Sequence, residues 1–203
     1  MFSLIFSMFT FSLSMSISPG PVNITILSSS MNYGLKQTFA FISGATIGFT
    51  ALLAAVCFGL YQVIALYPIL LNIITVLGTV LLLWMGWNIA RAHGESIQTD
   101  QLELPKAPTF MQGALLQWLN PKAWIAAVSG TALFSASHNA FYLILFILIY
   151  FGFCYLSLLI WGYAGQKLAV FLNQGSRMRV FNMVMGVLLM FIALQMSWSH
   201  FYA

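Results

Sequence analysis

Residues 69–87 read ILLNIITVLGTVLLLWMGW, a run with apolar side chains on all sides. Strands of a membrane barrel alternate apolar and polar residues over segments of about 10 residues, so this run excludes a barrel. A helix needs about 20 predominantly apolar residues to cross the hydrocarbon core of a bilayer. The run therefore predicts a transmembrane helix.

The composition of the whole chain extends this prediction. Of the 203 residues, 61% are hydrophobic and 5% are charged, whereas a soluble domain has roughly 45–50% and about 25%. Hydrophobic segments occupy residues 1–33, 39–64, 68–90, 110–135, 139–164 and 179–199. The first has neither a basic start nor a signal-peptidase site, so we expect it to stay in the protein as a helix. The sequence predicts an all-α membrane protein with six transmembrane helices.

The basic residues give the expected orientation. With six crossings, six of the seven lysine and arginine residues fall on one side, which should be the cytoplasmic side. These six are Lys36, Arg91, Lys106, Lys167, Arg177 and Arg179. Both termini would then lie outside. Because the basic residues are scattered at segment ends, the net charge of +4 does not indicate a nucleic-acid partner.

A polar stretch at residues 93–109 contains all three acidic residues, Glu95, Asp100 and Glu103. We interpret it as a cytoplasmic loop between two three-helix halves, residues 1–92 and 110–203. A repeat with an odd number of crossings must enter the membrane from opposite sides in its two copies. The expected architecture is therefore a 3+3 inverted repeat.

Both halves open with a helix that contains proline near mid-membrane depth. Pro19-Gly20-Pro21 interrupts the first helix, and Pro121 interrupts the fourth. Proline removes a backbone donor and clashes with the preceding turn, and broken helices at matching positions in two halves point to a transporter's binding site. Packing kinks are the alternative interpretation. The polar residues beside these breaks, Asn23, Asn120 and Lys122, favour a site, because a lysine at this depth costs roughly 2.5–3.5 kcal/mol.

These residues also carry a resemblance to a known family. Pro19-Gly20-Pro21 is followed by Gly34, Gly44 and Gly48, and residues 119–122 read LNPK. Together the motifs resemble those of the LysE/RhtB amino-acid exporters over nearly the whole chain, with Thr38 where that family often has glycine. Residues 19–24 and 161–165 resemble the branch that exports cysteine and O-acetylserine. The resemblance implies a secondary transporter that exports amino acids or close derivatives across the cytoplasmic (inner) membrane of a bacterium.

A zwitterionic substrate needs partners for both of its charges. Our hypothesis is that Lys122 and free amides at a half-helix N-terminus after Pro21 or Pro121 hold the carboxylate. Carbonyl groups freed by the breaks, with Asn23 and Asn120, would hold the ammonium. The six segments contain no Asp or Glu, so a carboxylate proton relay is missing from them.

Small residues recur every four positions at Ala40, Gly44 and Gly48, a spacing that favours close helix packing. A sliding surface for alternating access is the functional alternative. Tryptophans near segment ends, such as Trp118, Trp161 and Trp198, are typical of interfacial anchors.

Two other functions are the alternatives to transport. Cys57 and Cys154 lie in corresponding helices of the two halves, as a membrane thiol oxidoreductase would require, but their apolar neighbours do not activate a thiol. A non-transporting structural subunit would need no polar cluster at the membrane centre. No metal-ligand spacing, phosphate loop or nucleophile with a base is visible, so we expect no enzyme activity, metal or cofactor. The expected partners are an amino-acid substrate and the lipid bilayer, and a homodimer stays open.

Overall fold

The computed structural model describes residues 2–60, 62, 66–67, 69–92, 107–134, 140–172 and 177–202, and all regular structure in these ranges is helical. The elements are α1 (Phe2–Ile17), α2 (Pro21–Tyr33), α3 (Leu35–Ala55), the π-helical turn η1 (Val56–Leu60), α5 (Ile69–Arg91), α6 (Phe110–Trp118), α7 (Pro121–Phe134), α8 (Ala140–Leu172) and α9 (Arg177–Tyr202). The all-helical prediction is confirmed for these ranges. The acidic residues Glu95, Asp100 and Glu103 and the basic residue Lys106 lie outside them.

Several of these helices have the length and composition of membrane spans. Four qualify within the described residues: Leu35–Leu60, Ile69–Arg91, Ala140–Leu172 and Arg177–Tyr202. A fifth is obtained if α1 and α2, which are bent by 56° at the break between them, are counted as one span. The predicted segment at 110–135 is formed by α6 and α7, with 9 and 14 residues. Each is too short to cross a core of about 30 Å alone.

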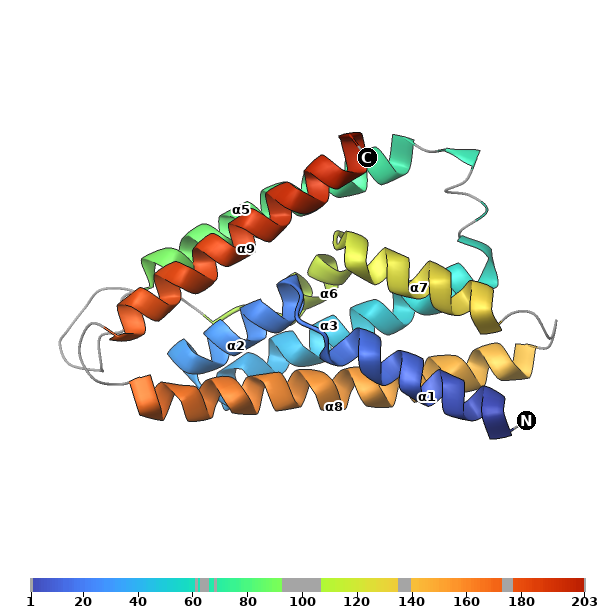
Figure 1. The fold of residues 1–203 in the computed structure, drawn as a ribbon, viewed down its shortest axis with the longest axis horizontal. Helices are drawn as coiled ribbons and strands as arrows, with labels where there is room; N and C mark the ends of the chain where they lie inside the picture. Colours follow the sequence, from blue (N-terminus) through green and yellow to red (C-terminus); the bar gives the residue numbers. More distant parts are fainter. Residues whose placement is uncertain are drawn as a thin grey trace.

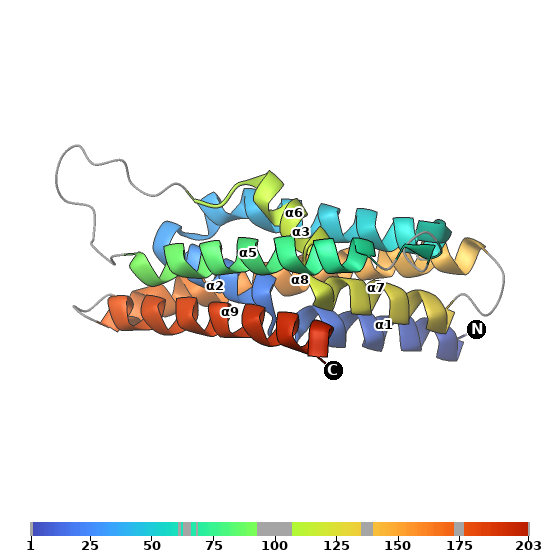
Figure 2. The same ribbon diagram turned by 90° about the horizontal axis from the view of Figure 1, so that it is seen from above.

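The helices form one bundle with a flanking pair. α8 runs along both α1 and α2, and α3 lies along α6 (Figures 1 and 2). α5 and α9 pack side by side, and in Figure 1 this pair diverges from α7 toward the C-terminal end of α9. Gly86 and Gly186 let the two backbones touch, because a Cβ atom on Gly186 would meet the Gly86 carbonyl oxygen at 2.4 Å.

Some helix boundaries differ from the apolar segments. α3 begins at Leu35 rather than at residue 39, directly after Gly34, which turns the chain with φ of 81°. α8 continues to Leu172 although the apolar run ends near residue 164. Its 33 residues span about 50 Å at 1.5 Å per residue. A helix of this length extends beyond the hydrocarbon core. The end of the apolar run in the sequence therefore indicates where the hydrocarbon core ends, and not where the helix ends.

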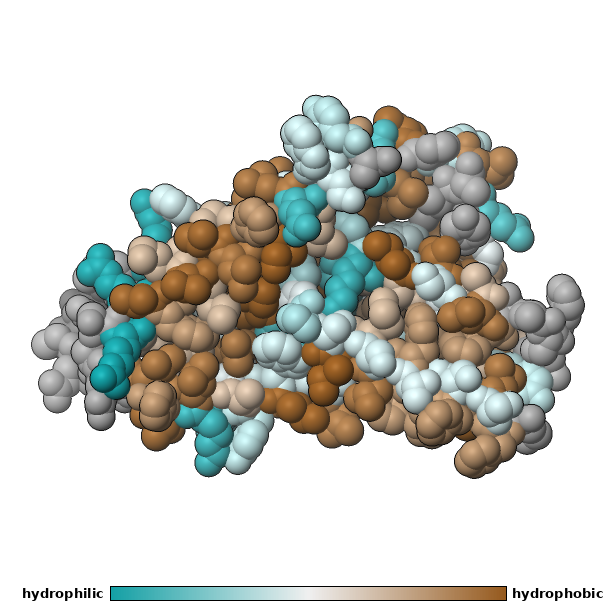
Figure 3. All heavy atoms as spheres, viewed as in Figure 1, coloured by the Kyte–Doolittle hydropathy of each residue, from teal (hydrophilic) through white to brown (hydrophobic). Residues whose placement is uncertain are grey.

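The outer surface is largely apolar. In Figure 3 hydrophobic side chains cover most of the visible face, while hydrophilic ones gather where α8 ends and α9 begins and in the middle of the face. Val80 on α5, Leu148 on α8 and Phe191 on α9 are 60–62% exposed. Such wide apolar exposure fits a protein surrounded by lipid, and the chain is a multi-pass membrane protein.

The small-residue stripe on α3 lies partly against α6. A Cβ atom on Gly44 would meet the Phe110 carbonyl oxygen at 1.9 Å, and one on Gly48 would meet the Ala114 Cα at 2.6 Å. Ala40 is exposed. The two glycines thus sit in direct backbone contact with α6, and Ala40 lies beyond that contact.

We expect Gly44→Val to separate α3 from α6, since the new side chain would overlap backbone that cannot move aside. Overpacking of this kind costs about 1–3 kcal/mol or more. Thermal unfolding in detergent, followed by size-exclusion chromatography, measures the change. Gly152→Val on α8 is the matched control, because nothing lies within 4 Å of a Cβ at that position. Equal midpoints for the two variants would contradict this account.

Candidate functional site

The break between α1 and α2 is held by a single ammonium group. Lys122, from α7, donates hydrogen bonds to the carbonyl oxygens of Ser18 at 2.7 Å and Pro19 at 3.3 Å, and to the Ser18 hydroxyl oxygen at 2.8 Å. A Cβ atom on Gly20 would lie 3.0 Å from the Lys122 Nζ, so glycine leaves the room that the lysine occupies. The three donors of this ammonium therefore all bond to the broken first segment.

The neighbouring carbonyl groups of α1 also have side-chain donors. Asn23 Nδ2 donates to the Ser16 carbonyl oxygen at 3.0 Å, and Trp161 Nε1 donates to the Ile17 carbonyl oxygen at 3.1 Å. The end of a helix leaves such carbonyls without intrahelical partners, and lipid offers none. Trp161 on α8 is thus a hydrogen-bond donor to the break, and its role as an interfacial anchor stays a prediction.

The second break, between α6 and α7, is capped from within. The Asn120 side-chain oxygen accepts the N–H of Lys122 at 3.1 Å, and Trp124 Nε1 donates to the Trp118 carbonyl oxygen at 2.7 Å. The Ala123 N–H bonds to the Asn120 carbonyl oxygen at 2.9 Å. Pro121 has no N–H that needs an acceptor, and the next two N–H groups, of Lys122 and Ala123, both have one. The start of α7 is therefore satisfied.

The start of α2 differs from the start of α7. It has no side-chain cap, and in the described part of the chain the N–H groups of Val22 and Asn23 have no hydrogen-bond acceptor. The side chain of Ser16, which is also buried, lines the same cavity as Val22 and Asn23. A free first turn carries positive partial charge and can bind an anionic group.

A small cavity joins these groups. We call it the Lys122 cavity; it measures about 40 Å³ and is lined by Ser16, Gly20, Val22, Asn23, Gln117, Asn120, Lys122, Tyr150 and Cys154 among others. The structure therefore brings Asn23, Asn120 and Lys122 together, with Gly20. The breaking prolines, Pro19, Pro21 and Pro121, do not line it. Sequence reasoning missed Ser16, Ser18, Gln117 and Trp161, because nothing in the local pattern links these residues to the prolines.

Two larger cavities lie on either side of this point. The first, which we call the Arg91 cavity, measures about 340 Å³ and is lined by Thr25, Ser28, Ser29, Asn32, Tyr33, Trp84, Met85, Asn88, Ile89, Arg91, Ala92, Pro108 and Gln112. Asn32 exchanges two hydrogen bonds with Asn182, of 3.0 and 2.8 Å, which tie α2 to α9 at this end of the molecule.

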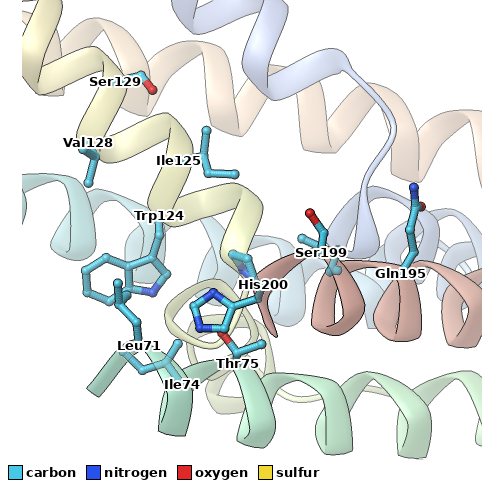
Figure 4. A pocket seen from close by; sticks show the side chains of 12 residues that line it. Leu71, Ile74, Thr75, Trp124, Ile125, Val128, Ser129, Gln195, Ser199 and His200 are labelled. Atoms are coloured by element: carbon cyan, nitrogen blue, oxygen red, sulfur yellow. The ribbon is translucent and has the colours of Figure 1, made fainter. Parts of the chain in front are cut away.

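The second, the His200 cavity, measures about 620 Å³ and lies between α7 and the α5–α9 pair. Figure 4 shows the Trp124 ring on α7 next to Leu71 and Ile74 on α5, with Gln195, Ser199 and His200 on α9. The His200 Nε2 lies 2.9 Å from the Asn72 side-chain oxygen and so links α9 to α5.

The stretch of α5 between the two cavities packs tightly. Gly78 lies against the second break, where an added Cβ would meet the Leu119 carbonyl oxygen at 1.9 Å. One turn further along, Leu82 is 1% exposed. Thr75 lines the His200 cavity and Met85 the Arg91 cavity, so this contact separates them.

The two cysteines do not share a cavity. Cys154 lines the Lys122 cavity, whereas Cys57 lines a different one and lies 3.2 Å from the Thr131 hydroxyl. Both thiols are free. Within the described ranges no three His, Cys, Asp or Glu side chains come together as metal ligands would. This arrangement favours two separate structural thiols over a redox pair.

Comparison with known proteins gives one family and several relatives. The family model "LysE type translocator" matches residues 13–199. The cysteine/O-acetylserine efflux protein of Salmonella typhimurium is 25% identical over 132 residues, which are 64% of this chain and 65% of that protein, just under two thirds. Leucine efflux proteins of Klebsiella pneumoniae and Salmonella choleraesuis are 28% and 30% identical over 149 residues, 70% of each chain. No solved structure matches.

The tryptophan at the first break gives a direct stability test. Trp161→Phe keeps the ring but leaves the Ile17 carbonyl without its donor, which should cost about 1–3 kcal/mol. We expect a lower thermal midpoint in lipid nanodiscs than for Trp198→Phe, because Trp198 is 66% exposed and stacks on Tyr202. A midpoint for Trp161→Phe equal to that of the control would show that its hydrogen bond is dispensable.

Proposed function

The chain belongs to the family of LysE-type translocators, and on this premise we propose that it is a secondary transporter exporting amino acids or close derivatives across the cytoplasmic membrane of a bacterium. Its relatives are named as efflux proteins for cysteine and O-acetylserine and for leucine. We take these three compounds as the candidate substrates. The observation that carries the proposal is the Lys122 ammonium bound to backbone carbonyls between two larger cavities.

The proposed topology has six crossings, with α1–α2 and α6–α7 each forming one broken span. The ends of α2, α5 and α8 lie together at one end of the molecule (Figure 1), where Lys36, Arg91 and Lys167 are found. We assign this end to the cytoplasm by the excess of basic residues. The N-terminus, at the opposite end in Figure 1, and the C-terminus of α9 then belong to the outer side.

The proposed 3+3 inverted repeat draws support from the choice of packing partners. α3 of the first half lies along α6 of the second, and α8 of the second half lies along α1 and α2 of the first. The third spans of the two halves, α5 and α9, pair with each other. Residues 1–92 and 110–203 would thus be interlocked repeats joined by the cytoplasmic loop 93–109, and not independent domains.

The chemistry of the break suggests how a zwitterion is held. A substrate ammonium competes with Lys122 for the Ser18 and Pro19 carbonyl oxygens, because both are ammonium donors to the same acceptors. Lys122, once released, pairs with the substrate carboxylate, and the free amides of Val22 and Asn23 add their partial positive charge. Asn23 and Asn120, bound to backbone here, fix the two helix ends around the substrate.

The size of the Lys122 cavity implies a conformational step. Its volume of about 40 Å³ is only slightly larger than the volume that one water molecule occupies in the liquid, about 30 Å³. The substrate can enter only if the surrounding helices move apart. α5, which is paired with α9, contacts the second break through Gly78 and Leu119, so we infer that displacement of this pair opens the site to one cavity at a time.

Efflux from loaded cells tests the function and the role of Lys122. Cells that make the protein should release labelled cysteine, O-acetylserine or leucine faster than cells without it. Lys122→Met should abolish this efflux because the one charged side chain among the described residues that line the Lys122 cavity is lost, while the amount of protein in the membrane is unchanged. Lys167→Met is the control, since the Lys167 ammonium lies 5.4 Å from the Tyr163 ring on α8. Normal efflux by the Lys122 variant would remove this lysine from the site.

A double substitution addresses the thiols. We expect Cys57→Ala with Cys154→Ala to keep at least about half of the wild-type efflux, because the two free thiols line different cavities and each change removes only one sulfur atom. The same transport measurement applies, with membrane protein level as the reference. Loss of efflux at a normal protein level would restore the electron-transfer alternative.

A further inference from the structure

The Arg91 cavity lies on the proposed cytoplasmic side of the break. It has the dimensions of a ligand pocket. Its volume of about 340 Å³ falls within the range of about 300–1,000 Å³ that small-molecule sites occupy. The Lys122 cavity, at about 40 Å³, does not. A whole amino acid therefore fits in the Arg91 cavity, beside α2 and α5, but not in the Lys122 cavity in this conformation.

Among the described residues, one charged side chain, that of Arg91, lines this cavity. Arg91 is in the last turn of α5, and its guanidinium carbon lies 4.3 Å from the centre of the Trp87 ring. A guanidinium on an aromatic face keeps its in-plane N–H donors available, and their fork matches a carboxylate. Within the described ranges Arg91 has no carboxylate partner.

A second, independent feature lies on α2. Ser28 on α2 is fully buried, lines the cavity, and its hydroxyl oxygen has no hydrogen-bond partner. Its neighbour Ser29 is bonded to Thr38 at 3.1 Å, and the hydroxyl of Ser30, which also has no partner, does not line this cavity. A buried polar atom without a partner is costly, and a ligand that donates to it would remove that cost.

We propose that the Arg91 cavity is the cytoplasmic loading site for the exported amino acid, with Arg91 binding the α-carboxylate and the Ser28 hydroxyl accepting from the α-ammonium. This rests on the proposed export function and adds a first binding step before the break. α2 then leads from one site to the other: Ser28 lies five residues, or about 7 Å, along the helix from Asn23. The ligand is a zwitterion that carries both a free carboxylate and a free ammonium.

The alternative role of Arg91 is that of a topological anchor, and three variants separate the two roles. Arg91→Gln removes the charge, Arg91→Lys keeps the charge but not the bidentate fork, and Arg179→Gln removes a cytoplasmic charge from an exposed position outside the cavity. In inside-out vesicles we expect Arg91→Gln to raise the KM for leucine or O-acetylserine at least about tenfold, with Arg91→Lys intermediate and Arg179→Gln near wild type. Equal KM values for Arg91→Gln and Arg179→Gln would overturn the proposal.

A labelling experiment gives a result that does not depend on transport. Asn88, exposed and one turn before Arg91, lines the cavity, so Asn88→Cys in the Cys57→Ala, Cys154→Ala background offers a thiol there. We expect an anionic methanethiosulfonate to react with it at least about threefold faster than the cationic analogue, and Arg91→Gln to abolish this preference. Leucine or O-acetylserine should slow the labelling, whereas leucinamide, which lacks the carboxylate, should not.

The two failures are distinguishable. If the wild-type protein moves none of the three candidate substrates, the proposed function fails, and protection of the thiol by leucine or O-acetylserine but not by leucinamide still supports a carboxylate-binding cavity. If efflux is normal but neither compound protects the thiol, or leucinamide protects equally, the loading site is overturned and the export function stands.

Discussion

The ammonium of Lys122 on the carbonyl oxygens of Ser18 and Pro19 is the interaction on which the rest of the structure depends. Breaking a helix inside a bilayer leaves backbone groups that lipid cannot satisfy. Here a lysine, an asparagine and a tryptophan from three different helices supply the missing donors. The hydrogen bonds between the Lys122 ammonium and these carbonyl oxygens reduce both the cost of burying the lysine and the cost of the unpaired carbonyls. This explains why the two features occur together.

This constraint also explains the tight packing around the breaks. Lys122 can reach the first segment only if the two halves of the chain interlock closely, and glycines on α3 and α5 permit that approach to α6 and to Leu119. The carbonyl groups of the second break receive donors from its own neighbourhood, whereas the first turn of α2 keeps free amides. The two breaks are therefore chemically unequal: the first leaves amides free at the start of α2, and the second supplies the Lys122 ammonium.

α2 connects the two cavities. It is buried along almost its whole length although many of its side chains are polar, and it runs from the Lys122 cavity to the wall of the Arg91 cavity. In the proposed mechanism this buried polar half-helix connects two sites, each of which offers oxygen acceptors and one cation, Arg91 or Lys122. Separation of the Arg91 and His200 cavities at Gly78 and Leu82 fits a carrier rather than an open channel.

The sequence by itself determined the membrane class, the helical content, the family, and the polar residues beside the two prolines, because long apolar runs and helix-breaking residues act locally. Only the tertiary structure decided that Lys122 bonds to the first break rather than standing free, that Trp161 belongs to it, and that Ser28 and Arg91 share a cavity. Each of these pairs joins residues far apart in the chain, and their distance is set by helix packing, which no local pattern encodes.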